Sequence, residues 1–182
     1  MLDRRALLLL PPAMLLGAPA LHAQSDDPRL AEQVKDAGLI YLSGGNPTFL
    51  ANTLRETLLW KEIESAWRDG AALAGCSAGA MALADHIPAL RLPTHTATNG
   101  LGLLPHIRVL PHFDKMFARI PDFMTRFMKV PDGVSVVGID EDTAIVGGPF
   151  EWEVQGRQSA WLFVDGHRKE FKSGQTLVTP KI

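Results

Sequence analysis

The chain has little of what disulfide, nucleic-acid or metal chemistry requires. Its 182 residues include one cysteine, Cys76, so an intrachain disulfide framework is excluded. Lys and Arg number 18 against 20 Asp and Glu, a formal net charge of −2, and this balance indicates no nucleic-acid partner. The sequence has no H-E-x-x-H motif, no paired-cysteine cluster and no G-x-G-x-x-G motif. It therefore predicts neither a metal nor an organic cofactor.

Long hydrophobic runs are also lacking, apart from one near the start. Arg4-Arg5 precedes an apolar stretch over 6–16, and small residues follow as far as Ala23. This pattern predicts an export signal peptide over residues 1–23, and hence an exported, periplasmic protein. The stretch is too short and too interrupted by proline to span a bilayer, so no stable membrane association is expected. The alternative is that Ala6–Leu10 form the first buried strand of a cytoplasmic domain.

Residues 24–182 have the length of a single catalytic domain. Hydrophobic residues make up 46% of the chain, enough for a sizeable core. Asn46 and Pro47 predict the start of a helix, whose apolar periodicity continues to Trp67. Short apolar runs predict strands around 39–42, 71–74, 108–110, 134–139 and 143–146. This alternation predicts an α/β domain with a mainly parallel sheet, and the turns after Val154 predict a C-terminal β-hairpin region.

The segment Gly75-Cys76-Ser77-Ala78-Gly79 has the pattern of a nucleophile elbow. An apolar run leads into it and an Ala-rich helix start follows, so Ser77 is expected at the tip of a sharp strand–turn–helix. Backbone N–H groups at such a helix start can hold the oxyanion of a tetrahedral intermediate. The bland alternative is a turn of small residues with a structural serine. The Cys76 thiol is expected to point away and to be packed and inert, and a nucleophilic Cys76 is the other alternative.

A serine nucleophile needs a base and an acid from elsewhere in the chain. His112 follows an expected strand directly, whereas the other histidines lie in loop or turn contexts or in the leader. Glu141 follows the strand 134–139 and is the acid expected to orient His112, with Asp85 and Asp114 as further candidates. Asp140 and Asp142 are expected to form a solvated acidic turn. The chain order Ser–His–Glu differs from that of α/β-hydrolases.

Four ordered motifs carry a resemblance to a known family. They are Tyr41-Leu42-Ser43-Gly44-Gly45-Asn46, Gly75-Cys76-Ser77-Ala78-Gly79-Ala80, Pro111-His112-Phe113-Asp114 and Gly138-Ile139-Asp140-Glu141-Asp142-Thr143-Ala144. Over about residues 26–178, the chain resembles the peptidase E and cyanophycinase family of serine peptidases. The resemblance implies a class I glutamine amidotransferase-like (flavodoxin-like) fold with three α/β/α layers. The family usually has about two more strand–helix units at the front, so the fold is expected to be N-terminally shortened.

The resemblance also implies roles for individual residues. Ser77 would be the nucleophile, His112 the base and, as in the cyanophycinase branch, Glu141 the acid. The peptidase E branch takes an Asp from the loop between Ser and His, but residues 89–99 contain no Asp or Glu. The N–H groups of Gly45 and Ala78 would form the oxyanion hole. Asn46 and Arg126 would contact the substrate, with Arg119 as a second choice for Arg126.

The expected function is that of a serine hydrolase which cleaves peptide or isopeptide bonds next to an acidic residue. Its substrate would be a small peptide or aspartyl dipeptide, because peptidase E acts after an N-terminal Asp and cyanophycinases act on β-aspartyl-arginine linkages. The alternative from another class is a non-catalytic binding or assembly module that keeps the pocket of the fold. A third interpretation, an amidotransferase-type hydrolase, would use Cys76 in place of Ser77.

Overall fold

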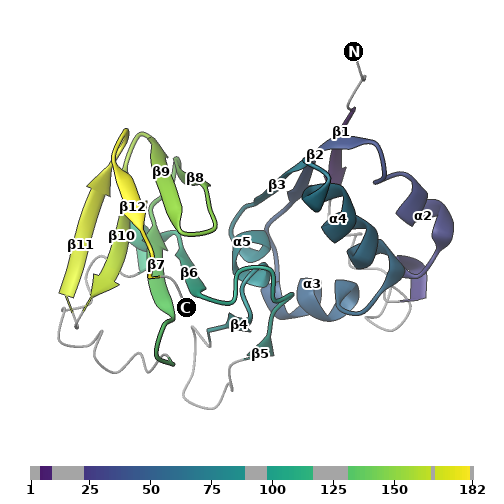
Figure 1. Ribbon diagram of the computed structural model, residues 1–182. Helices are drawn as coiled ribbons and strands as arrows, with labels where there is room; N and C mark the ends of the chain where they lie inside the picture. The colour runs from purple at the N-terminus through teal and green to yellow at the C-terminus, as the bar shows by residue number, and fades with distance from the viewer. Residues whose placement is uncertain (1–4, 10–22, 89–97, 117–130, 165–166, 181–182) are drawn as a thin grey trace.

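The helices and strands of the chain form two lobes, and the helix α5 lies between them (Figure 1). The computed structural model describes residues 5–9, 23–88, 98–116, 131–164 and 167–180. The elements are β1 (Arg5–Leu9), α2 (Pro28–Glu32), β2 (Ala37–Leu42), α3 (Pro47–Leu54), α4 (Leu58–Arg68), β3 (Ala72–Gly75), α5 (Ala78–Ala82), β4 (His86–Ile87), β5 (Thr98–Asn99), β6 (Ile107–Pro111), α6 (Phe113–Met116), β7 (Ser135–Ile139), β8 (Thr143–Gly147), β9 (Glu151–Gly156), β10 (Ser159–Val164), β11 (His167–Lys172) and β12 (Thr176–Val178).

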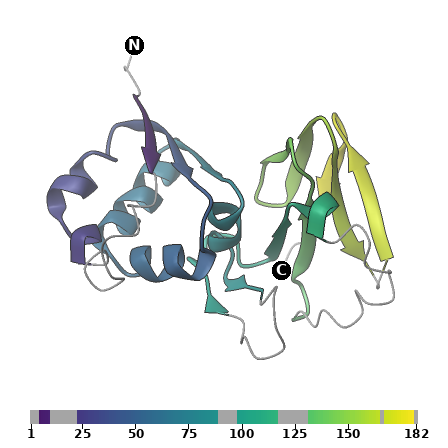
Figure 2. The same cartoon turned by 180° about the vertical axis from the view of Figure 1, so that it is seen from behind.

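The first lobe is a short parallel sheet with helices against one face. Its strands lie in the order β1-β2-β3, and both pairings are parallel. Viewed from behind, these strands lie in front of α4 (Figure 2). Side chains alternate along β2: Ile40 and Leu42 are buried in the core with α3 and α4, whereas Leu39 is 38% exposed. Each fully buried side chain of this size stabilises the fold by roughly 1.5–3 kcal/mol.

The helical region after β2 begins as expected but is divided in two. Asn46 caps α3 through its Oδ1, which accepts a hydrogen bond from the N–H of Phe49 at 2.9 Å, and Pro47 is the first helical residue. The single helix expected as far as Trp67 is wrong, because the chain leaves the helix at Arg55 and Glu56 has a φ of 65°. Thr57 then caps α4. The apolar periodicity runs through the break because both helices bury the same face.

The second lobe is built mainly from antiparallel strands. One sheet has the order β11-β10-β7-β6 and another the order β12-β9-β8. Both contribute to a core that includes Val137, Val154, Leu162 and Leu177. The pairs β8–β9 and β10–β11 form antiparallel hairpins, as expected for the C-terminal region.

The fold is therefore mixed α/β, with less parallel structure than expected. Within the described residues, three strand pairings are parallel and five are antiparallel. The short turns between the late strands leave no room for crossover helices, so these strands pair antiparallel. The three-layer arrangement stays a prediction.

The start of the chain also joins the first lobe. Residues Arg5–Leu9 pair with β2 in parallel, from Ala6 beside Leu39 to Leu9 beside Leu42. The export signal over residues 1–23 and the domain boundary at residue 24 stay predictions. Among the residues that the structure describes, no helix is both long enough and apolar enough to cross a bilayer.

Helix α5 packs against both lobes. Met81 and Ala82 belong to the core of the first lobe, whereas Ala80 packs against the core of the second. The residue that begins α5 therefore lies where the two lobes meet. That residue is Ala78, which directly follows Ser77.

Candidate active site

Ser77 occupies a strained turn between β3 and α5. Its φ is 52° and its ψ is −109°, a backbone conformation that non-glycine residues rarely adopt. The flanking glycines allow the turn because there is no room for side chains there. A Cβ at Gly79 would lie 2.0 Å from the carbonyl oxygen of Leu42, and one at Gly75 would lie 2.7 Å from the backbone nitrogen of Ala80. Strain of this kind is found at functional sites, where the surrounding structure maintains it.

The hydroxyl of Ser77 lies beside the imidazole of His112. The distance from Ser77 Oγ to His112 Nε2 is 2.9 Å, a hydrogen bond. On the other side of the ring, His112 Nδ1 lies 3.2 Å from Glu141 Oε1. The three side chains thus form a continuous chain of contacts from hydroxyl to carboxylate, the order that proton transfer from a serine requires.

His112 is held by the strand before it and the ring after it. It follows β6 and has a φ of 51°. The next residue, Phe113, is 2% exposed and lies so close to Gly138 on β7 that a Cβ there would be 2.7 Å from its ring. Trp161 and Phe163 flank the same ring, with centroids 5.7 and 5.6 Å away. This packing ties α6 to the sheet and so limits where His112 can lie.

Glu141 reaches His112 because β6 and β7 are parallel neighbours. Pro111 on β6 is in register with Ile139 on β7, so His112 and Glu141 both follow the carboxyl ends of adjacent strands. Ser77 comes to the same place from the other lobe, after the carboxyl end of β3.

The solvated acidic turn expected around Glu141 is wrong for Asp140. That residue is buried, and its carboxylate accepts hydrogen bonds from the N–H of Ser159 at 3.2 Å and from Trp161 Nε1 at 3.0 Å. Burial raises the pKa of Asp140, and the hydrogen bonds from Trp161 and Ser159 offset part of that rise. Asp142 is exposed, as expected, and lies 3.7 Å from Arg157. Asp140 follows β7 directly and lies between two donors from β10, Ser159 and Trp161. The alternation of side chains along a single strand does not reveal such partners.

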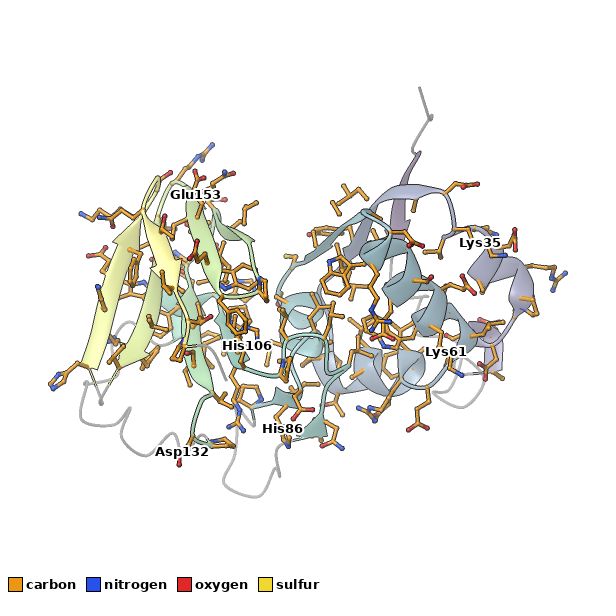
Figure 3. All side chains as sticks on the ribbon, viewed as in Figure 1. Lys35, Lys61, His86, His106, Asp132 and Glu153 are labelled. Atoms are coloured by element: carbon orange, nitrogen blue, oxygen red, sulfur yellow. The ribbon has the colours of Figure 1, made fainter. Side chains whose placement is uncertain are left out.

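The other acid candidates have different partners. Asp85 Oδ2 lies 2.6 Å from Nδ1 of His86, a different histidine. Asp114 accepts a hydrogen bond from the backbone N–H of Glu141 rather than from His112. Figure 3 shows His86 at the lower rim of the molecule and His106 in its interior, where His106 Nε2 contacts the carbonyl of Pro149.

The glycine loop after β2 lies against the elbow. A Cβ at Gly44 would be 3.5 Å from Ser77 Cβ and 3.9 Å from Ser77 Oγ. Gly45 has a φ of 132°, a Cβ placed there would meet no atom within 4 Å, and none of the described residues accepts a hydrogen bond from its N–H or from that of Ala78. These donors suit an oxyanion hole, whose members stay unpaired until charge develops. The oxyanion roles of Gly45 and Ala78 stay predictions.

Of the residues predicted to contact the substrate, the structure describes Asn46 but not Arg126. Asn46 lies next to the glycine loop, and its Oδ1 is engaged in capping α3. Arg126 and its second choice, Arg119, lie outside the described residues.

Cys76 differs from the expected packed thiol. Its side chain is exposed. A hydrogen bond with the Cys76 thiol, together with burial, raises the pKa of Tyr41. The imidazole of His112 nevertheless bonds to Ser77 rather than to Cys76. In the part of the chain that the structure describes, no cluster of three His, Cys, Asp or Glu side chains could hold a metal ion.

Comparison with known proteins agrees with the motifs. The model of Peptidase family S51 matches residues 16–148. A cyanophycinase from Geminocystis herdmanii (strain PCC 6308) is 29% identical over 157 residues, which are 81% of this chain and 57% of that protein. A crystal structure of a peptidase from an acI-B1 Actinobacterium is 41% identical and superimposes with a TM-score of 0.74, covering 86% of this chain and 66% of that one.

The chain spans little more than half the length of the cyanophycinase and just under two thirds of the solved peptidase. The matched family segment includes the glycine loop, the elbow, His112 and Glu141. The resemblance seen in the motifs is confirmed: the chain belongs to Peptidase family S51.

Proposed function

We propose that the protein is a serine peptidase whose nucleophile is Ser77, with His112 as base and Glu141 as the acid that orients it. The observation that carries the proposal is the contact chain of 2.9 Å from Ser77 Oγ to His112 Nε2 and 3.2 Å from His112 Nδ1 to Glu141 Oε1. A hydroxyl is a weak nucleophile, and an adjacent imidazole activates it.

The reaction proceeds in two halves. Ser77 Oγ attacks the carbonyl carbon of the substrate while His112 Nε2 takes its proton. The backbone N–H groups of Gly45 and Ala78 stabilise the oxyanion. His112 then returns the proton to the leaving amine, which departs and leaves an acyl-serine. Water hydrolyses the acyl-serine by the same proton transfers in reverse. Glu141 stabilises the imidazolium that forms in each half.

The substrate class we propose is a peptide or isopeptide bond next to an acidic residue. The support is the family resemblance, together with the 29% identity to a protein named cyanophycinase. A substrate carboxylate needs a cation, and we assign this role to Arg126, because a guanidinium can bind a carboxylate in a bidentate manner. Asn46, at the mouth of the glycine loop, would donate to the same substrate through its amide nitrogen.

Labelling with a fluorophosphonate probe tests the nucleophile. We expect the wild-type protein to be labelled at Ser77, as read by peptide mass spectrometry, and Ser77→Ala to stay unlabelled. Ser65→Ala, which removes an exposed serine on α4, is the matched control and should label as the wild type does. Folded wild-type protein that never labels would favour a binding module. Labelling that survives Ser77→Ala but is lost in Cys76→Ala would favour the thiol.

Hydrolysis rates test the substrate class. We expect Asp-X dipeptides or β-Asp-Arg to be cleaved, and the matching Asn-X or β-Asn-Arg compounds, which lack the charge, to be cleaved much more slowly. Arg126→Ala should raise KM for the acidic substrates and leave fluorophosphonate labelling intact. Equal rates on charged and uncharged substrates would contradict the acidic preference while leaving the serine mechanism in place.

A further inference from the structure

Asp114 connects the element that bears the base to the turn that bears the acid. It lies on α6, two residues after His112, and its Oδ1 accepts a hydrogen bond from the backbone N–H of Glu141 at 3.0 Å. Its side chain is only 17% exposed. Its second oxygen lies 3.4 Å from Nζ of Lys115, whose side chain is 65% exposed. A carboxylate that accepts from an N–H forms a stronger hydrogen bond than a neutral acceptor does.

The residue before Glu141 ties the same turn to the sheet. Asp140, the residue before Glu141, is buried, and burial and the negative charge of nearby Asp114 both raise its pKa. Asp140 is in turn bonded to Ser159 and Trp161 on β10. Asp140 is therefore held by β10, and the side chain of Asp114 holds the next residue, Glu141.

The other contact of Glu141 is at its backbone, where Thr143 Oγ1 donates to the Glu141 carbonyl at 3.2 Å. The side chain of Glu141 is 45% exposed, and the residue lies at the start of a turn whose next residue, Asp142, has a φ of 52°. Its carboxylate is 3.2 Å from His112 Nδ1, at the long end of hydrogen-bond range. A small outward movement of the turn would break that contact, since the interaction weakens steeply with distance and angle.

We propose that Asp114 is a positioning residue, which holds the backbone of Glu141 so that its carboxylate meets His112. The inference rests on the proposed triad of Ser77, His112 and Glu141. The partners of the Asp114 side chain are the Glu141 N–H and Lys115, rather than the nucleophile or the imidazole, so it acts through Glu141.

The charge state of Asp114 suits this role. Burial raises the pKa of Asp114, but the hydrogen bond from the N–H of Glu141 and the neighbouring Lys115 outweigh burial, and the pKa lies below its usual value. The acceptor is therefore ionised throughout the neutral range.

The experiment measures the rate of fluorophosphonate labelling of Ser77, resolved into the maximal inactivation rate and the half-saturating probe concentration. We expect Asp114→Ala to lower the maximal rate about 10- to 100-fold, because misplacing a group by about 1 Å costs up to that much. The half-saturating concentration should change less than about twofold, because Asp114 does not contact the probe. Asp114→Asn keeps an acceptor oxygen of the same reach and should restore the rate to within about threefold of the wild type.

A double-mutant cycle shows whether Asp114 acts through Glu141. We expect Asp114→Ala combined with Glu141→Ala to be no slower than Glu141→Ala alone, because a side chain that is already absent cannot be misplaced. Asp142→Asn removes one exposed negative charge from the same turn and Lys115→Ala removes the other partner of Asp114. Both should label at the wild-type rate. If Asp114→Ala lowers the melting temperature so far that it does not fold, Asp114→Ser, a polar side chain too short to reach Glu141, replaces it.

The outcomes separate this inference from the triad beneath it. Wild-type labelling rates in folded Asp114→Ala or Asp114→Ser, while Glu141→Gln is slow, would overturn the positioning role and leave the triad standing. Additive losses in the double mutant, or an Asp114→Asn variant as slow as Asp114→Ala, would also overturn it. A Glu141→Ala variant with the wild-type rate, or folded wild-type protein that never labels, would remove the triad and the inference together.

Discussion

Replacement of Glu141 by glutamine isolates the charge that the proposed triad places beside His112. Glutamine has nearly the same shape and keeps an oxygen that can accept from Nδ1, so orientation is retained while the negative charge is lost. At the 3.2 Å that separates Glu141 Oε1 from His112 Nδ1, the attraction between full charges is about 1.3 kcal/mol in bulk water and about 5 kcal/mol at an effective dielectric constant of about 20.

The exposure of the pair decides where in that range the effect falls. The side chains of His112 and Glu141 are 41% and 45% exposed, so water screens the interaction and the lower part of the range applies. We therefore expect a loss of about 2 kcal/mol of transition-state stabilisation, which is about 30-fold in rate. Glu141→Ala should lose more, because it also removes the group that orients the ring.

The assay is the maximal rate of fluorophosphonate labelling of Ser77, measured at low and at high salt. Asp142→Asn is the matched control, since it removes the same charge one residue away. The wild-type advantage over Glu141→Gln should shrink as salt screens the half-exposed pair. If Glu141→Gln and Glu141→Ala both label at the wild-type rate, the reasoning fails and Glu141 is not part of the site.

Three further predictions concern the elbow, the two acids that flank Glu141 in the structure and the start of the chain. Gly79→Ala should unfold or displace the elbow, because its Cβ would lie 2.0 Å from the carbonyl oxygen of Leu42. Gly44→Ala should melt near the wild-type temperature, because the nearest atom to its Cβ would be 3.5 Å away. Equal melting temperatures for the two variants would contradict this. In denaturant titrations from pH 7 to pH 3, the stability that wild type gains over Asp114→Asn should be present above the usual Asp pKa of 3.8 and be lost as pH falls through the lowered pKa of folded Asp114. Asp140 should show the opposite trend, because its pKa is raised in the folded protein. The stability that wild type gains over Asp140→Asn should be present below the usual Asp pKa of 3.8 and be lost as pH rises. Parallel trends for the two acids would be inconsistent with the structure. N-terminal sequencing of the protein after expression in a bacterium with an export system should find a mature chain that begins near Gln24, and an intact Met1 in the periplasmic fraction would argue against the signal peptide.

Local structure was predictable wherever a few neighbouring residues determine it. The Asn46-Pro47 start of α3 and the glycine-flanked turn at Ser77 each depend on cap or turn chemistry within about five residues. The sequence did not predict the break between α3 and α4 at Glu56, because the apolar periodicity continues through it. The sheet was predicted to be more parallel than it is, because short apolar runs do not show the direction of a strand.

The residues of the candidate site were named from the sequence, but their supports were not. His112 and Glu141 each follow a strand, which is a local signal. The burial of Asp140 depends on Trp161 and Ser159, about 20 positions further along the chain, and the exposure of Cys76 depends on how β3 meets its neighbours. The role of Asp114 as a partner of the Glu141 backbone had no sequence signal beyond its acidic side chain.

The sequence by itself determined the elbow, the capped helices, the strand-end positions of the polar residues and the family, because each of these depends on short motifs and their order. Only the tertiary structure decided that a hydroxyl from one lobe meets an imidazole and a carboxylate from the other. That meeting depends on α5 packing against both cores and on the register of β6 with β7. Packing and register join residues far apart in the chain, and no local pattern encodes the distance between them.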